Sequence, residues 1–319
     1  MNIAYLICAH TDIVQLKRLS LDLVRSGDVY IHIDKKVCDI NYIAQVHSLE
    51  KQTSAGVYKI IFVKERIAVY WGGWSQVKVQ RLLLKSSIGN KNRRYDRFVF
   101  LSGLCYPIMS PNQLKAEFEA HLQKQYLNAF NMSIGAYGLY RKRFCGYHLF
   151  RDTPLWFGRQ MKRCLVAGVR DLLWNIHIRK PDYILRNGIH ENVFFGGSWI
   201  AINRECAKYV YNNLYDDSEY AHYFKTCYAS DELCIHTIVM NSPFARFSTE
   251  VKMGLNNTPT IFQELSPLHK LHYDKAIKVY TERDYDEIVC SGKMFVRKIV
   301  SGISDGLVKK LDLYKNRVL

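Results

Sequence analysis

Residues 3–34 read IAYLICAHTDIVQLKRLSLDLVRSGDVYIHID. The apolar run at 3–8 is compact enough for a buried central strand, and residues 12–26 then repeat apolar side chains at helical spacing. A second apolar run at 29–33 predicts another strand. A strand, a helix and a strand in this order are typical of two parallel strands joined by a crossover helix.

The same alternation continues along the first third of the chain. We expect strands at 59–63 and 97–101, with a helix at 76–86 between them. This pattern predicts an α/β fold in which helices flank a mostly parallel central sheet. Ligands of such sheets bind beyond the carboxyl ends of the strands, which is where His32 and Asp34 fall.

The composition is that of a globular protein with an excess of positive charge. The chain has 319 residues, is 48% hydrophobic and carries a net charge of +16, which favours anionic partners such as nucleotides, lipid headgroups or nucleic acid. Its nine cysteines are scattered singly and include no CxxC pair that would suggest a zinc site or a redox motif. We therefore expect reduced cysteines in a reducing compartment. Neither a signal peptide nor an apolar run of about 20 residues is present, so we expect a cytoplasmic, bacterial protein.

Residues 139–181 differ from the rest of the chain. They contain ten Lys or Arg and only two Asp, interleaved with aromatic residues. One interpretation is a surface that meets an anionic membrane, and the other is a solvated insertion whose aromatic residues pack on the core. Because no internal repeat or linker is evident, we expect residues 1–319 to form a single catalytic unit that includes this insertion.

Six short motifs follow one another in order along nearly the whole chain. They are YIHIDKK (30–36), VYWGGWS (69–75), LSGLCYP (101–107), GGSW (196–199), SDE (230–232) and FVRK (295–298). Together they resemble the core-2/I-branching β-1,6-N-acetylglucosaminyltransferase and peptide O-xylosyltransferase family, glycosyltransferase family 14. The resemblance implies a GT-A-type nucleotide-sugar-binding fold, with a nucleotide-binding half at 1–110 and a catalytic and diphosphate-binding half at 190–299.

Sugar transfer from a nucleotide diphosphate requires a base for the acceptor hydroxyl and positive charge for the leaving diphosphate. Glu232 is the candidate base, at the expected start of a helix after Ser230 and Asp231. Ser followed by acids is also ordinary helix-capping chemistry. The resemblance assigns the base to Glu232 and leaves Asp231 to cap or orient.

The resemblance also implies that two basic side chains near the C-terminus replace the metal ion of other nucleotide-sugar transferases. The second aligns with Lys298 and the first with Lys275, where an Arg is usual, and Lys278 competes with Lys275. A lysine keeps the charge but loses the planar fork that binds phosphate bidentately. The alternative is that Lys293, Arg297 and Lys298 form a solvated basic face.

One DxD-like string, Asp284-Tyr285-Asp286, could suggest a metal site. It lies in a stretch with helical character, where acids two residues apart do not share a face, so we expect a helix surface. Asp216-Asp217 has the composition of a loop. We therefore expect no metal or other cofactor, and transfer that persists in excess chelator.

Residues of the earlier motifs are candidates for the donor and acceptor pocket. In the family the segment containing His32 and Asp34 lines the nucleotide pocket, although a strand-end acid also often caps a turn. Trp71 and Trp74 offer flat faces that stack on sugars or fill a core, and Ser75 is the expected helix cap.

The GGSW motif is expected to approach the donor sugar and the acceptor. It contributes Gly197, where the family usually has Ser, followed by Ser198 and Trp199. Two departures from the family pattern affect the acceptor side. Cys105 stands where an Asp is usual, and residues 251–271 lack a clear counterpart of the acceptor-binding aromatics.

We expect an inverting, metal-independent transferase that moves a sugar from a UDP-sugar to a glycan hydroxyl. N-acetylglucosamine is the leading sugar by resemblance, with xylose and galactose as alternatives, and a lipid-linked surface glycan at the inner membrane surface is the expected acceptor. A nucleic-acid or anionic-surface binding protein is the rival, motivated by the charge, but no nucleic-acid-binding motif is present. A transferase-like scaffold without turnover is a third alternative.

Overall fold

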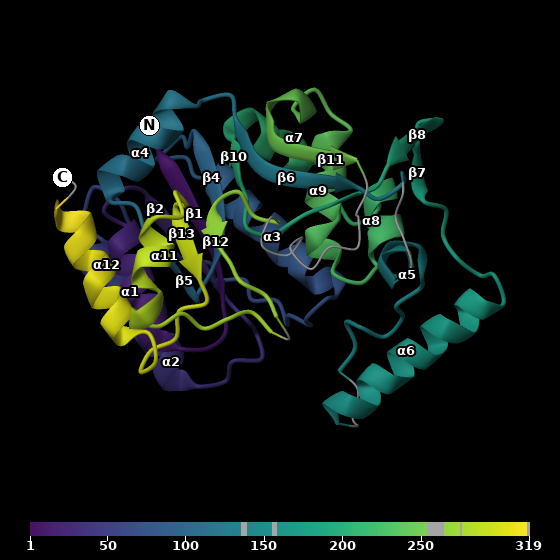
Figure 1. Ribbon diagram of the computed structural model, residues 1–319, viewed down its shortest axis with the longest axis horizontal. Coiled ribbons are helices and arrows are strands. Elements are labelled where there is room, and N and C mark those ends of the chain that lie inside the picture. The colour runs from purple at the N-terminus through teal and green to yellow at the C-terminus, as the bar shows by residue number, and fades with distance from the viewer. Residues whose placement is uncertain (135–138, 155–157, 254–264, 275, 318–319) are drawn as a thin grey trace.

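A central sheet organises the protein (Figure 1). The computed structural model describes residues 1–134, 139–154, 158–253, 265–274 and 276–317. Within these ranges the sheet has eight strands: in order β11 (Ser248–Met253), β6 (Gln125–Asn131), β10 (Ala201–Asn203), β4 (Arg97–Ser102), β1 (Ile3–Ala9), β2 (Asp28–Ile33) and β3 (Ile60–Phe62), with β9 (Phe194–Phe195) paired to β6.

The sheet is mostly parallel. Strands β3, β2, β1 and β4 pair in parallel, β10 runs antiparallel to β4 and β6, and β11 is again parallel to β6. The strands expected at 3–8, 29–33, 59–63 and 97–101 all form, with ends that differ by one residue. The predicted α/β class with a mostly parallel central sheet is therefore confirmed.

Alternate residues of the central strands enter two cores. In β1, Ala4 and Leu6 belong to the core on one face, whereas Ile3, Tyr5 and Ile7 belong to the core on the other. Both faces are apolar because both are covered by helices. The first face carries α3 (Trp74–Ile88), α7 (Arg204–Asn213), α8 (Glu219–Phe224) and α9 (Cys234–Met240), and the second carries α1 (Ile13–Leu23), α2 (Ile40–Thr53) and α4 (Pro111–Ala120).

The C-terminal segment adds a small second sheet. Strand β13 (Phe295–Arg297) lies between β12 (His269–Lys270) and β5 (Cys105–Pro107). Helices α11 (Tyr285–Val289) and α12 (Asp305–Arg317) pack with it around a third core. The antiparallel pairing of β13 with β5 brings Arg297 opposite Cys105, close to the end of β4.

The basic segment contains two helices, and one of them stands away from the sheet. These are α5 (Leu139–Cys145) and α6 (Arg159–Asn175), followed by the hairpin of β7 (Tyr183–Arg186) and β8 (Ile189–Asn192) (Figure 1). No helix in the described part of the chain combines the length and hydrophobicity needed to span a bilayer.

The N-terminus of α3 is capped by a residue of the basic segment. The carboxylate of Asp152 accepts from the backbone N of Ser75 at 3.2 Å and from its Oγ at 2.7 Å. The helix begins at Trp74, one residue before Ser75, so the prediction that Ser75 is the cap is wrong. A side chain at Gly73 would collide with Asp152, which explains the glycine at this position.

Candidate functional site

The carboxyl ends of β1, β2 and β4 meet the end of β13, and a half-buried cation lies at this junction. Arg297 ends β13, and its Nη1 donates a hydrogen bond to the Oγ of Ser102 at the end of β4. The guanidinium lies 4.7 Å from the ring centre of Trp199. A cation stacked on an aromatic face keeps a fixed orientation.

No carboxylate among the described residues lies within ion-pair distance of Arg297. Its Nε has no hydrogen-bond partner, and burial lowers its pKa without removing its charge at neutral pH. The register places Cys105 beside it, at the position where the family usually has an Asp. A half-buried cation without a described counterion is suited to an anionic ligand.

Sequence reasoning missed this role of Arg297, because it treated residues 293–298 as a possible solvated face. That alternative is wrong for Arg297, which is packed against Trp199 and Ser102. The alternation of side chains along β13 could have indicated this position. Arg297 lies two residues after the buried Phe295, so both side chains are on the same face of the strand.

Further cations gather around His10, which follows β1. Burial lowers the pKa of His10, and the charges of Arg297, Lys36 and Lys298 lower it further, against the opposing effect of Asp34. Lys298 therefore lies in the same neighbourhood as Arg297, as its predicted diphosphate-binding role requires. The role itself stays a prediction.

The other predicted lysine positions differ from each other. Lys275 lies outside the described residues. Its competitor Lys278 forms an ion pair with Asp284 at 2.6 Å, so its charge is already compensated.

His32 and Asp34 are both engaged by the protein. His32 is fully buried, and its Nε2 accepts from the backbone N of Ile67 at 2.9 Å. Burial lowers its pKa to about 4, so the ring is neutral. We had expected His32 to line the nucleotide pocket. Because its side chain has no exposed surface, it supports the end of the strand instead and does not contact a nucleotide directly.

Asp34 closes a turn. Its Oδ1 accepts from the backbone N of Lys36 at 2.9 Å and of Val69 at 3.1 Å, and its Oδ2 lies 3.5 Å from the Nζ of Lys36. The turn-capping alternative therefore describes its contacts, and a bond to the nucleotide stays a prediction.

Asp231 and Glu232 lie in a short 3₁₀ turn, η1 (Ser230–Glu232), immediately before α9. Asp231 Oδ2 accepts from the Oγ of Ser198 at 2.6 Å and from the Nε2 of Gln76 at 3.0 Å. Ser230 instead donates to the carbonyl of Phe224 at 2.7 Å, so the helix-capping alternative does not describe its contacts. Asp231 thus joins three separate segments and holds the turn in place.

The carboxyl of Glu232 is an unusually weak acid. Burial and the charge of Asp231 raise its pKa to about 8, against the opposing effect of Arg143. Burial also raises the pKa of Asp231, and the hydrogen bond from Ser198 works in the opposite direction. A carboxyl whose pKa lies near neutrality is suited to proton transfer.

Aromatic side chains surround Glu232. Burial raises the pKa values of Tyr140 and Tyr228, and the negative charge of Glu232 raises both further. The guanidinium of Arg143 lies over both rings, 4.9 Å from Tyr140 and 5.1 Å from Tyr228. Arg143 was not identified from the sequence, where it was one of ten basic residues in the segment at 139–181.

The acids and the cations share one edge of the sheet. Burial raises the pKa of Cys8, near the end of β1, and the charges of both Asp34 and Asp231 raise it further, whereas Arg297 lowers it. Cys8 therefore lies within electrostatic reach of both groups. Asp231 and Arg297 therefore both lie near the carboxyl edge, where α/β sheets bind their ligands, and Glu232 is the neighbour of Asp231 in η1.

The two tryptophans of the VYWGGWS motif have different environments. Trp71 is 68% exposed and lies edge-on to Tyr228 at 5.5 Å, whereas Trp74 is buried in the core. Trp74 therefore has a packing role, and the prediction that it lines the pocket is wrong. Trp71 remains available for stacking on a sugar.

The GGSW loop is tied to the η1 turn. The backbone N of Gly196 donates to the carbonyl of Glu232 at 2.9 Å, and Ser198 binds Asp231. A side chain at Gly197 would meet the carbonyl of Leu265 at 2.9 Å, which explains why Gly replaces the usual Ser. Trp199 packs between His269 and Arg297, so the loop connects the acids with the cation.

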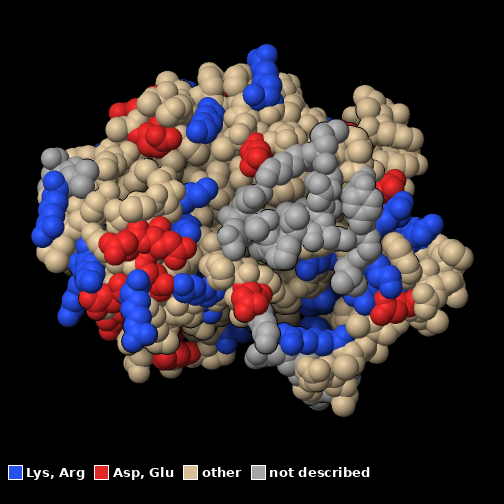
Figure 2. All heavy atoms as spheres, in the orientation of Figure 1, with Lys and Arg blue, Asp and Glu red and all other residues tan. Residues whose placement is uncertain are grey.

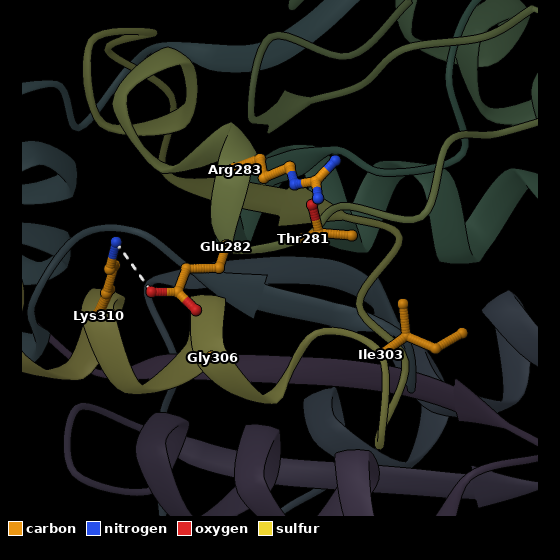
Figure 3. Close-up of a pocket in the computed structure, with 6 residues that line it drawn as sticks. All are labelled: Thr281, Glu282, Arg283, Ile303, Gly306 and Lys310. Atoms are coloured by element: carbon orange, nitrogen blue, oxygen red, sulfur yellow. Dashed lines mark ion pairs between the residues drawn. The ribbon is translucent and has the colours of Figure 1, made fainter.

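The described residues contain no group of three or more His, Cys, Asp and Glu that could hold a metal ion. In the DxD-like string, Asp284 is bound to Lys278 and Thr281, and Asp286 is exposed. A cavity of about 590 Å³ lies beside this string, and Figure 3 shows the ion pair of Glu282 and Lys310 at its wall. None of the predicted site residues lines that cavity.

Comparison with known proteins finds a family match in the N-terminal part. The family model for Core-2/I-Branching enzyme matches residues 3–141. Xylosyltransferase 1 of Homo sapiens is 22% identical over 231 residues, which are 72% of this chain and 21% of the human protein. Xylosyltransferase 1 of Mus musculus is 21% identical over 262 residues, covering 81% of this chain and 24% of the mouse protein.

The chain thus spans less than a quarter of the length of these relatives. Among solved structures, that of mouse Xyloside xylosyltransferase 1 in its apo form aligns with 92% of this chain and 97% of its own, at 13% identity and a TM-score of 0.35. The family match covers the first three of the six motifs, and the curated relatives extend the similarity further along the chain. Residues 3–141 thus match the Core-2/I-Branching enzyme family, the family that the order of the motifs had suggested.

Proposed function

We propose that this protein is an inverting glycosyltransferase that moves a sugar from a UDP-sugar to a glycan hydroxyl without a metal ion. The observation that carries the proposal is the GGSW loop, which binds Asp231, the neighbour of the weakly acidic Glu232, through Ser198, and packs through Trp199 on Arg297, a half-buried cation with no described counterion. The family match of residues 3–141 supports the same reaction class.

In the proposed reaction Glu232 acts as the general base. It takes the proton of the acceptor hydroxyl, whose oxygen then attacks the anomeric carbon of the donor sugar. The bond between that carbon and the β-phosphate oxygen breaks on the opposite side, so the configuration inverts. Asp231 positions Glu232 through its bonds to Ser198 and Gln76.

The leaving group is the UDP diphosphate, and cations stabilise its developing charge. Arg297 and Lys298 are the proposed binding residues, with Lys275 as a third candidate. A guanidinium held by Trp199 and Ser102 is preorganised, so it reorganises little as the charge develops.

The donor sugar is N-acetylglucosamine in the leading version of the proposal, and xylose is the main alternative because the curated relatives are named xylosyltransferases. Galactose is a third candidate. Exposed Trp71 is placed to stack on a sugar ring next to Tyr228. The acceptor proposed here is a glycan, in a lipid-linked form.

The proposal is tested by measuring UDP release from the three UDP-sugars, with Mg²⁺ in one series and excess EDTA in the other. We expect one donor to be turned over at similar rates in both series. Release that is abolished by EDTA would contradict the metal-independent mechanism. A protein that turns over no donor and shows no thermal shift with UDP would contradict the proposal as a whole.

A further inference from the structure

The helix α6 presents an apolar stripe that no described residue covers. Figure 1 shows α6 projecting from the rest of the protein. The stripe consists of Met161, Leu165 and Leu172 of α6 and Ile176 at its C-terminal cap, which are between 38% and 62% exposed. Because their spacings are four, seven and four residues, they lie within an arc of about 60° around the helix axis. We call these four residues the α6 stripe.

The other side of α6 is held against the protein. Val166 is buried, and Lys142 of α5 forms an ion pair with Asp171 at 3.3 Å and lies over the ring of Trp174 at 5.7 Å. These contacts give the helix a preferred orientation. The stripe is therefore presented outward by the fold and is not the side that packs on the core.

The segment that carries the stripe is strongly positive. Residues 139–181 carry ten Lys or Arg against Asp152 and Asp171, and Arg163 and Arg179 are exposed at α6 and just beyond its end. Figure 2 shows Lys and Arg side chains around this part of the molecule. Asp152 caps α3 and Asp171 is paired, so neither acid offsets the exposed cations.

An apolar stripe on a strongly basic segment is complementary to one class of surface. Anionic phospholipid headgroups attract the cations, and the acyl-chain boundary accepts the apolar side chains. A second copy of this chain fits less well, because it would bring the same positive charge to the same place.

We propose that the α6 stripe docks the protein on an anionic lipid bilayer. The helix has 17 residues and is therefore about 25 Å long, and it would lie in the plane of the interface with the stripe facing the acyl chains. This inference is independent of the glycosyltransferase chemistry, since none of the stripe residues belongs to the candidate site.

The test is cosedimentation of the full chain with phosphatidylcholine vesicles that contain about one third phosphatidylglycerol, compared with pure phosphatidylcholine vesicles. We expect binding to the anionic vesicles, weak binding to the neutral ones, and loss of binding as salt is raised. Leu172→Glu should lower the partition coefficient about tenfold or more, because it removes a large apolar side chain and adds a negative charge.

The matched control is Gln160→Glu, which adds the same charge at an exposed polar position of α6 outside the stripe. It should retain most of the binding. Both substitutions lie at exposed positions, and circular dichroism and UDP thermal shifts check that folding and nucleotide binding are unchanged, so failure of docking is distinct from failure of the enzyme.

Three outcomes would overturn the proposal. The first is wild-type protein that stays in the supernatant with anionic vesicles. The second is equal binding by Leu172→Glu and Gln160→Glu. The third is a concentration-dependent dimer, seen by analytical ultracentrifugation, that Leu172→Glu dissociates, because the stripe would then be an interface between two copies.

Discussion

Replacing Glu232 by Gln should remove catalysis and stabilise the protein at the same time. The amide has nearly the same shape as the carboxyl but cannot accept the proton of an acceptor hydroxyl. General-base catalysis contributes about 10²- to 10⁴-fold, so we expect the transfer rate to fall by about that factor. UDP binding should be little changed, because the proposed diphosphate contacts lie on Arg297 and Lys298.

The gain in stability follows from the raised pKa. Lifting the pKa of Glu232 from 4.5 to about 8 means that its ionisation costs about 4 to 5 kcal/mol more in the folded protein than in the unfolded chain. The side chain is partly exposed, so water screens part of this cost, and we expect about 2 kcal/mol at pH 9.

The sign of the effect depends on pH. A carboxyl whose folded pKa is raised destabilises the folded state progressively from pH 4.5 to about pH 8, where it becomes charged. Wild type should therefore lose stability relative to Glu232→Gln over this range, and the two should be equally stable near pH 4.

The assay combines urea unfolding at pH 4, 7 and 9 with initial rates of UDP release. Asp217→Asn is the control, because it removes one exposed acid outside the site. Rates within about threefold of wild type for Glu232→Gln would refute the base assignment. Equal unfolding free energies at pH 9 would refute the electrostatic reasoning about its environment.

Four further predictions follow from the same structure. The transfer rate should rise with pH and level off above about pH 8, because Glu232 must be deprotonated to act as a base, and this step should be seen in a pH–rate profile. Lys298→Ala should weaken UDP binding about tenfold in titration calorimetry, with Lys310→Ala unchanged, since one charge-assisted hydrogen bond contributes about 1.5 to 3 kcal/mol. Asp152→Asn should lower stability by about 1 kcal/mol in urea unfolding, because it weakens the cap of α3; no loss would mean that the cap is dispensable. Trp71→Ala should raise the KM for sugar substrates with little effect on stability, because its side chain is mostly exposed, and a core-like loss of stability would contradict that assignment.

The central strands could be predicted from the sequence because their signal is local. Strands such as β1 and β2 are buried on both faces, so they read as short continuous apolar runs between polar turns. Glu232 was proposed as the base in a different way, through the resemblance of its motif to a family, and this role stays a prediction. The apolar residues after it correctly marked α9.

Other features depend on contacts between residues far apart in the chain, so no local sequence pattern could predict them. The cap of α3 comes from Asp152, 77 residues after Ser75, so the nearer Ser75 was the natural but wrong choice. The half-buried position of Arg297 depends on the docking of β13 against β5 and on Trp199. The split between exposed Trp71 and buried Trp74 likewise depends on which side of the α3 start faces the core.

The central claim is that cationic side chains, and not a metal ion, hold the diphosphate in the site that contains Glu232. The most direct measurement is a crystal structure of the protein with UDP, grown in excess EDTA. We predict that the β-phosphate oxygens lie about 3 Å from nitrogen atoms of Arg297 and Lys298, with Glu232 facing the same space. UDP bound away from these residues, or a diphosphate that is ordered only when a divalent ion is supplied, would contradict the claim.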